Sequence, residues 1–155
     1  MPGYKTHLAG GLITYLLVYK ITTMLHVVRS PDLKHHLFFV GLTLLGSIFP
    51  DIDVSSKMQQ LFWMASLVAL PSALFLNKFH LFIGIGVICL SLLFIHHRTL
   101  THRFWFITLL PLAGALFFAT QYPSHKRLFL SACIFFATGA ASHLILDRGI
   151  KRFFS

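Results

Sequence analysis

The chain has 155 residues, of which 56% are hydrophobic and only 11% are charged, and its mean hydropathy is +0.77. Ordinary globular domains carry roughly twice that share of charged residues, so this composition argues against a water-soluble domain. The formal net charge is +9, but the basic residues stand singly or in pairs between apolar runs, as they do at the ends of membrane segments. We therefore expect one membrane-embedded domain covering residues 1–155, with membrane lipid and no nucleic acid as its partner.

Six apolar segments follow one another along the chain. They run over Leu8–Val28, Leu37–Pro50, Leu61–Leu76, Phe79–Ile95, Phe104–Thr120 and Leu128–Leu146. These runs are continuous and lack the period-two alternation of half-buried strands. They predict an all-α fold, a polytopic membrane helix bundle of about six transmembrane or membrane-embedded helices. Several are shorter than the roughly 20 residues that span a bilayer comfortably, which local thinning of the bilayer can accommodate.

Individual segments differ in quality. The second segment is the weakest, because it contains Gly41 and Gly46. No A-x-A cleavage site follows the first segment, so we expect a helix of the mature protein there rather than a signal peptide. Asn77 and Lys78 predict a minimal turn between the third and fourth segments.

Acidic residues are rare in this chain, which has four aspartates and no glutamate. Asp51 and Asp53 stand in the motif FPDID, and Asp147 closes the motif SHLILD. A carboxylate in an apolar chain must be paired, hydrated or bound to metal, so these positions indicate a functional site. Asp51 and Asp53 follow Pro50, which ends a helix, and they can bind one ion or bridge two. A solvated acidic turn is the alternative interpretation.

The motif HRTLTH carries His97 and His102. On a continuous helix these two side chains would point about 140° apart, so a loop or a helix break is needed to bring them together. Arg98 lies between them and can hold a phosphate or carboxylate in bidentate fashion. Basic residues that contact lipid headgroups at a hairpin turn are the alternative.

The motif SHLILD places His143 and Asp147 four residues apart, so both side chains project from one face of a helix. This spacing suits two metal ligands, or a histidine oriented by a carboxylate; an ion pair at a helix end is the alternative. The small residues at 139–141 before the motif would allow another helix to approach closely. His7 is a weaker candidate, because a lone histidine at a helix start is more often a cap or an interfacial residue.

The order of the segments predicts a shared location for these motifs. If all six segments cross the membrane, His7, His96 and the three motifs reach the same side. The opposite side then holds Asp32 and the remaining histidines, which are His26, His35, His36, His80 and His125. Lysines and arginines divide seven against six between the two sides, so the positive-inside rule does not decide the orientation. The basic C-terminal tail slightly favours a cytoplasmic site. Carboxylate and imidazole together are a ligand set for a divalent transition metal.

Four ordered motifs carry a resemblance to a known family. They are THLAGG with His7, FPDID with Asp51 and Asp53, HRTLTH with His97, Arg98, Thr101 and His102, and SHLILD with Ser142, His143 and Asp147. In this order the chain resembles the YdjM family of bacterial inner-membrane proteins. The resemblance implies a multi-helix protein of the bacterial inner membrane with metal-dependent hydrolase activity. Val54, Thr99 and Arg103 depart from the residues usual in that family; the first removes a potential ligand and the last favours an anionic substrate.

We therefore predict a metal-dependent hydrolase that acts on a lipid or lipid-linked (phospho)ester, such as a phospholipid, through a metal-activated water. One or two divalent ions are expected, zinc first and manganese or iron next. The predicted metal ligands are His7, Asp51, Asp53, His97, His102, His143 and Asp147. The predicted catalytic residues are Asp53, Arg98, His102 and Asp147. Two alternatives stay open: a non-catalytic metal-binding or transport protein, and a scaffold that recruits a partner.

Overall fold

The computed structural model describes residues 3–28, 32–53, 57–94 and 103–148, and every element within these ranges is helical. The α-helices are α1 (Tyr4–Met24), α2 (Leu33–Ile48), α3 (Lys57–Phe75), α4 (Phe79–Phe94), α5 (Phe104–Gln121) and α6 (Lys126–Arg148). Two short 3-10 helices, η1 (Phe49–Asp53) and η2 (Pro123–His125), precede α3 and α6. The all-α prediction is confirmed, and each predicted apolar segment corresponds to one α-helix.

Helices α1 and α2 extend beyond the apolar runs at their N-terminal ends. α1 begins at Tyr4 rather than Leu8, and α2 begins at Leu33 rather than Leu37. The Asp32 side chain accepts a hydrogen bond from the His35 amide at 3.0 Å and so caps the first turn of α2. Polar caps of this kind add a turn that a hydrophobic run does not reveal.

Two helices end at residues in the left-handed conformation. His26 follows α1 and Asn77 follows α3, each with a φ of 55°. At Asn77 the next amide, of Lys78, donates to the Ala73 carbonyl at 2.8 Å, which is the closing bond of a Schellman motif. Asparagine tolerates this conformation better than most residues, and the predicted turn between α3 and α4 is confirmed.

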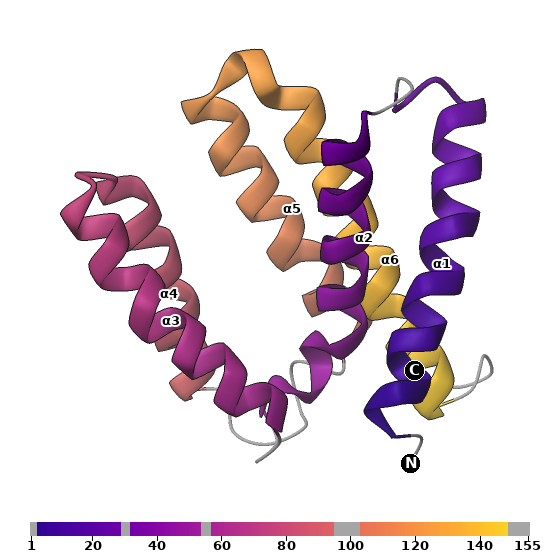
Figure 1. Cartoon of the computed structure of the whole chain (residues 1–155), viewed down its shortest axis with the longest axis horizontal. Helices are drawn as coiled ribbons and strands as arrows, with labels where there is room; N and C mark the ends of the chain where they lie inside the picture. The colour runs from indigo at the N-terminus through magenta and orange to yellow at the C-terminus, as the bar shows by residue number, and fades with distance from the viewer. Residues whose placement is uncertain (1–2, 29–31, 54–56, 95–102, 149–155) are drawn as a thin grey trace. The chain divides into compact units, whose positions relative to one another are not determined.

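The chain divides into two compact units. The first contains Met1–Pro50 and His102–Ser155, and the second contains Asp51–Thr101. In the first unit α2 packs along α6, α1 contacts both of these helices, and α5 packs against α6 (Figure 1). In the second unit α3 and α4 form a helical hairpin. These units are defined by contacts between residues and do not show whether each folds independently. The prediction of a single domain therefore stays a prediction.

The core of the first unit is small and built around aromatic rings. Phe39 of α2 stacks on Phe135 of α6 with ring centroids 4.6 Å apart, and Tyr15 of α1 packs on the same pair. A second cluster joins Ile107 of α5 to Leu144 of α6. Leu144 of this cluster directly follows His143 in α6.

Two segments of the described chain, Leu33–Asp51 and Pro123–Asp147, are long and apolar enough to cross a membrane. These segments contain α2 and α6. Two shorter apolar stretches, Phe62–Phe75 and Trp105–Gln121, lie in α3 and α5. The helical fold is confirmed by the described elements, whereas the arrangement of six membrane spans stays a prediction.

Candidate metal centre

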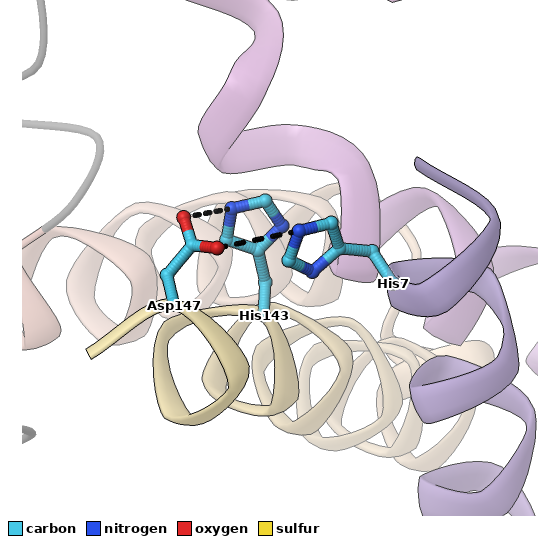
Figure 2. A group of neighbouring side chains, drawn as sticks. All are labelled: His7, His143 and Asp147. Atoms are coloured by element: carbon cyan, nitrogen blue, oxygen red, sulfur yellow. Dashed lines mark ion pairs between the residues drawn. The ribbon is translucent and has the colours of Figure 1, made fainter. Parts of the chain in front are cut away.

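Helices α1 and α6 bring three of the predicted ligands together. His7 lies in the second turn of α1, and His143 and Asp147 lie one turn apart near the end of α6. Figure 2 shows the His7 ring reaching from α1 toward the two side chains of α6. One nitrogen or oxygen from each residue falls within 4.8 Å of the others. The (i, i+4) spacing predicted from SHLILD thus places both α6 residues on one face, toward His7.

Small residues permit the close helix contacts that hold this site. A Cβ atom at Gly46 of α2 would lie 2.1 Å from the Phe136 carbonyl oxygen of α6, and one at Gly139 of α6 would lie 2.1 Å from the Thr43 carbonyl oxygen of α2. Only glycine fits at these two positions, because real Cβ atoms essentially never approach closer than 3.0 Å. The approach predicted at Gly139 is confirmed. Gly46 made the second segment the weakest of the predicted helices, but in the structure it is the residue that lets α2 approach α6.

The spacing of the ligand atoms suits one shared ion. His7 Nε2 lies 3.4 Å from Asp147 Oδ1, and His143 Nε2 lies 3.4 Å from Asp147 Oδ2. A direct charge-assisted hydrogen bond is shorter, about 2.7–2.9 Å. Two ligands at the usual zinc distance of about 2.0–2.1 Å in tetrahedral geometry are separated by about 3.3 Å. These separations are ion-pair distances, and they are also compatible with three residues arranged around a metal ion.

The two imidazole rings stack, with centroids 3.9 Å apart and an interplanar angle of 18°. Two imidazolium ions at this separation would repel each other in a buried setting. The arrangement therefore disfavours two charged rings, and histidine binds metal in its neutral form. A carboxylate and two neutral imidazoles carry one negative charge, which a divalent cation compensates.

The orientation of His143 is fixed by a backbone carbonyl of α2. Its Nδ1 atom lies 2.7 Å from the Ser47 carbonyl oxygen. Because a carbonyl oxygen only accepts, Nδ1 carries the hydrogen and donates it. In the neutral tautomer that carries this hydrogen, the Nε2 atom, which points toward Asp147, has the lone pair that a metal would bind, as in the outer-shell arrangement common around metal-bound histidines.

All three side chains are removed from solvent. The exposed fractions are 2% for the His7 side chain, 0% for that of His143 and 6% for that of Asp147. Burying a carboxylate is costly unless its charge is compensated. Burial, ligand type and spacing together show that these three residues could hold a metal ion.

The remaining predicted site residues lie elsewhere in the chain. Asp51 and Asp53 lie in η1 and belong to the second unit. His97, Arg98 and His102 lie outside the described residues. The metal-binding and catalytic roles of these five residues stay predictions.

His7 was the weakest candidate in the sequence, yet it contributes directly to the described cluster. Its isolation in the sequence gave no hint of the stacking on His143. The contact of the Ser47 carbonyl with His143 could not be predicted either, because every residue has a main-chain carbonyl and its residue type does not indicate this contact. The feature that could have indicated this contact is the pairing of small residues in α2 and α6, which predicts that the two backbones approach closely.

The fold and the cluster define a class: an apolar all-helical protein with a buried site of two histidines and one aspartate between its helices. Within this class, the chain belongs to the family of YdjM inner membrane proteins, whose family model matches residues 1–152. The family resemblance found in the motifs is thus confirmed, and its description supports a location in the inner membrane. No curated protein and no solved structure matches the chain.

Proposed function

We propose that this protein is a membrane-embedded, metal-dependent hydrolase that acts on a lipid or lipid-linked (phospho)ester. The observation that supports the proposal best is the buried cluster of His7, His143 and Asp147, with 3.4 Å between the paired ligand atoms. Three protein ligands leave a further coordination position for water or substrate. This is the arrangement of catalytic zinc sites, whereas structural zinc sites are closed by four protein ligands.

The donor set favours zinc, with manganese or iron as the next choices. Imidazole binds zinc and iron well, and carboxylate suits manganese as well as zinc. The described residues account for one ion. A second ion would need ligands from the predicted set at Asp51, Asp53, His97 and His102.

When bound, the metal would supply Lewis acidity, lowering the pKa of a water molecule and polarising the scissile ester. The chain's own residues have separate tasks. Ser47 holds His143 in the tautomer that presents Nε2, and Asp147 supplies the negative charge that retains the cation. Asp53 or His102 would accept the proton of the attacking water. Arg98 would hold an anionic headgroup in bidentate fashion.

A lipid substrate follows from the proposed placement in the bilayer. α1 exposes large apolar side chains along its length, which lipid would cover in a six-span bundle. They include Leu12, Ile13, Leu16, Leu17, Ile21 and Met24. With six spans the cluster would lie where the ends of α1 and α6 meet the headgroup region. Lipid esters present their scissile bonds at that depth.

A non-catalytic metal-binding or transport protein is the second candidate. The deep burial of His143, at 0% exposure, favours it. A site that only retains or relays an ion needs no access for a substrate. The two candidates share the metal centre and differ in whether a lipid ester is cleaved.

The test is metal content by elemental analysis of protein purified without a histidine tag. The wild type is compared with His143→Asn and Asp147→Asn, and His125→Asn serves as a control because His125 is exposed in η2. We expect near-stoichiometric metal in the wild type and control and a loss in both site variants. A screen of phospholipid and lipid-phosphate hydrolysis with the loaded protein then separates the hydrolase from the non-catalytic candidate. Wild-type protein that stays metal-free after loading would refute both.

A further inference from the structure

We propose that Pro50 is a positioning residue for His143: it leaves the Ser47 carbonyl free to orient the histidine ring. The inference deepens the proposed function and rests on it where metal affinity is concerned. It gives the proline of FPDID a task distinct from that of the aspartates that follow it.

The contact that Pro50 would protect lies between α2 and α6. His143 Nδ1 donates to the Ser47 carbonyl over 2.7 Å, and both residues are 0% exposed. Ser47 belongs to the last turn of α2, where carbonyl groups begin to lose their helical partners. In an uninterrupted α-helix the Ser47 carbonyl would accept from the amide four residues later and would not be directed at a neighbouring helix.

The chain tightens from an α-helix to a 3-10 helix at this point. The Phe49 amide already donates three residues back, to the Gly46 carbonyl. In that register the next carbonyl, of Ser47, would be served by the amide of residue 50. Residue 50 is proline and has no N–H. The local hydrogen-bond pattern therefore supplies no donor from this position, and the carbonyl accepts from His143.

Pro50 is fully buried, so an N–H group at this position would be removed from water. Any other residue there would bring a buried amide that requires an acceptor. The acceptor in register is the Ser47 carbonyl. Replacement of Pro50 would thus create a competitor for the bond that keeps Nδ1 of His143 protonated and Nε2 turned toward Asp147.

The first measurement concerns the wild-type protein without metal. Nitrogen-15 NMR of histidine-labelled protein, at a pH where the rings are neutral, reports which ring nitrogen carries hydrogen. His143 is assigned by the signal that disappears in His143→Asn. We expect hydrogen on Nδ1. Hydrogen on Nε2 would overturn the inference without the need for any proline variant.

The second measurement compares Pro50→Ala with Pro111→Ala, which removes a proline inside α5. We expect Pro50→Ala to populate the Nε2-protonated tautomer and to lower zinc affinity about 10- to 100-fold, the usual effect of changing an outer-shell partner. Pro111→Ala should keep the wild-type tautomer and affinity. Zinc affinity is measured by competition with a chelator, and circular dichroism checks that each variant is helical.

The outcomes separate this inference from the proposed function. A helical Pro50→Ala variant with the wild-type tautomer and zinc affinity overturns the positioning role. If the wild type binds no zinc, the proposed function fails, and the tautomers of metal-free wild type and Pro50→Ala still decide the role of Pro50. If Pro50→Ala loses its helical structure, hydrogen on Nε2 of wild-type His143 would still overturn the inference.

Discussion

Gly139→Ala is the substitution whose effect follows most directly from the structure. The added Cβ would lie 2.1 Å from the Thr43 carbonyl oxygen, which falls about 0.9 Å short of the 3.0 Å that real Cβ atoms respect. The obstacle is main chain on a packed helix, so a side-chain rotation cannot remove it. Overpacking of this kind typically costs about 1–3 kcal/mol, which exceeds the gain of about 1 kcal/mol in helix propensity from glycine to alanine.

The same displacement would disturb the candidate metal centre. One turn along the contact, His143 Nδ1 donates to the Ser47 carbonyl at 2.7 Å. A separation of α2 from α6 by about 0.9 Å would stretch that distance beyond the range of a hydrogen bond. Metal–ligand distances in proteins lie within about 0.2 Å of their usual values, so His143 must keep its orientation to bind zinc well. We therefore expect at least a tenfold loss of zinc affinity together with a lower thermal unfolding midpoint.

The matched control lies on the partner helix. Gly41 is also a helical glycine, but a Cβ added there meets nothing within 4 Å. Gly41→Ala should keep zinc affinity and leave stability unchanged or slightly raised. Thermal unfolding in detergent and zinc competition are measured for both variants. Equal behaviour of Gly139→Ala and Gly41→Ala would refute the close contact between α2 and α6.

Three further predictions concern the first two helices. Tyr15→Phe removes the 2.7 Å hydrogen bond between the phenol and His36 Nδ1 and should lower the free energy of unfolding by about 1 kcal/mol in denaturant titrations; an unchanged value contradicts the bond. Hydrogen bonds from the His35 amide and side chain lower the pKa of Asp32 below its ordinary value of 3.8. The contribution of this cap to the free energy of unfolding is therefore complete above pH 3.8 and is lost as the pH falls through the lowered pKa. Carbon-13 NMR of this carboxyl should give a midpoint below 3.8, and a higher midpoint excludes the cap. Leu16→Cys on the exposed face of α1 should resist a water-soluble maleimide in lipid nanodiscs and react in the denatured protein, whereas rapid labelling in nanodiscs would place this face in water.

Much of the helical architecture could be predicted from the sequence, because long apolar runs specify helices directly. The pairing of His143 with Asp147 was equally accessible, since a spacing of four residues fixes a shared helix face. The N-terminal ends of α1 and α2 were missed because capping and polar first turns are independent of hydrophobic pattern. Gly46 was misjudged for a similar reason: a glycine that lowers helix propensity can still be required where two backbones meet.

The position of His7 could not be derived in the same way. Its contact with His143 depends on how α1 lies against α6, which is set by packing between segments far apart in the chain. The hydrogen bond from His143 to Ser47 is also long-range and involves a main-chain atom. Sequence motifs identify side chains that can bind a metal, but the geometry that joins them depends on the helix crossings.

The cluster draws its ligands from α1 and α6, the first and last of the described helices. The cluster is therefore incomplete until α6 has been synthesised and has packed against α1. Under the proposed function, metal binding would require that the polypeptide has been made through to α6. A ligand that binds only the folded form stabilises it by mass action. A bound ion would therefore stabilise the packing of α1 against α6.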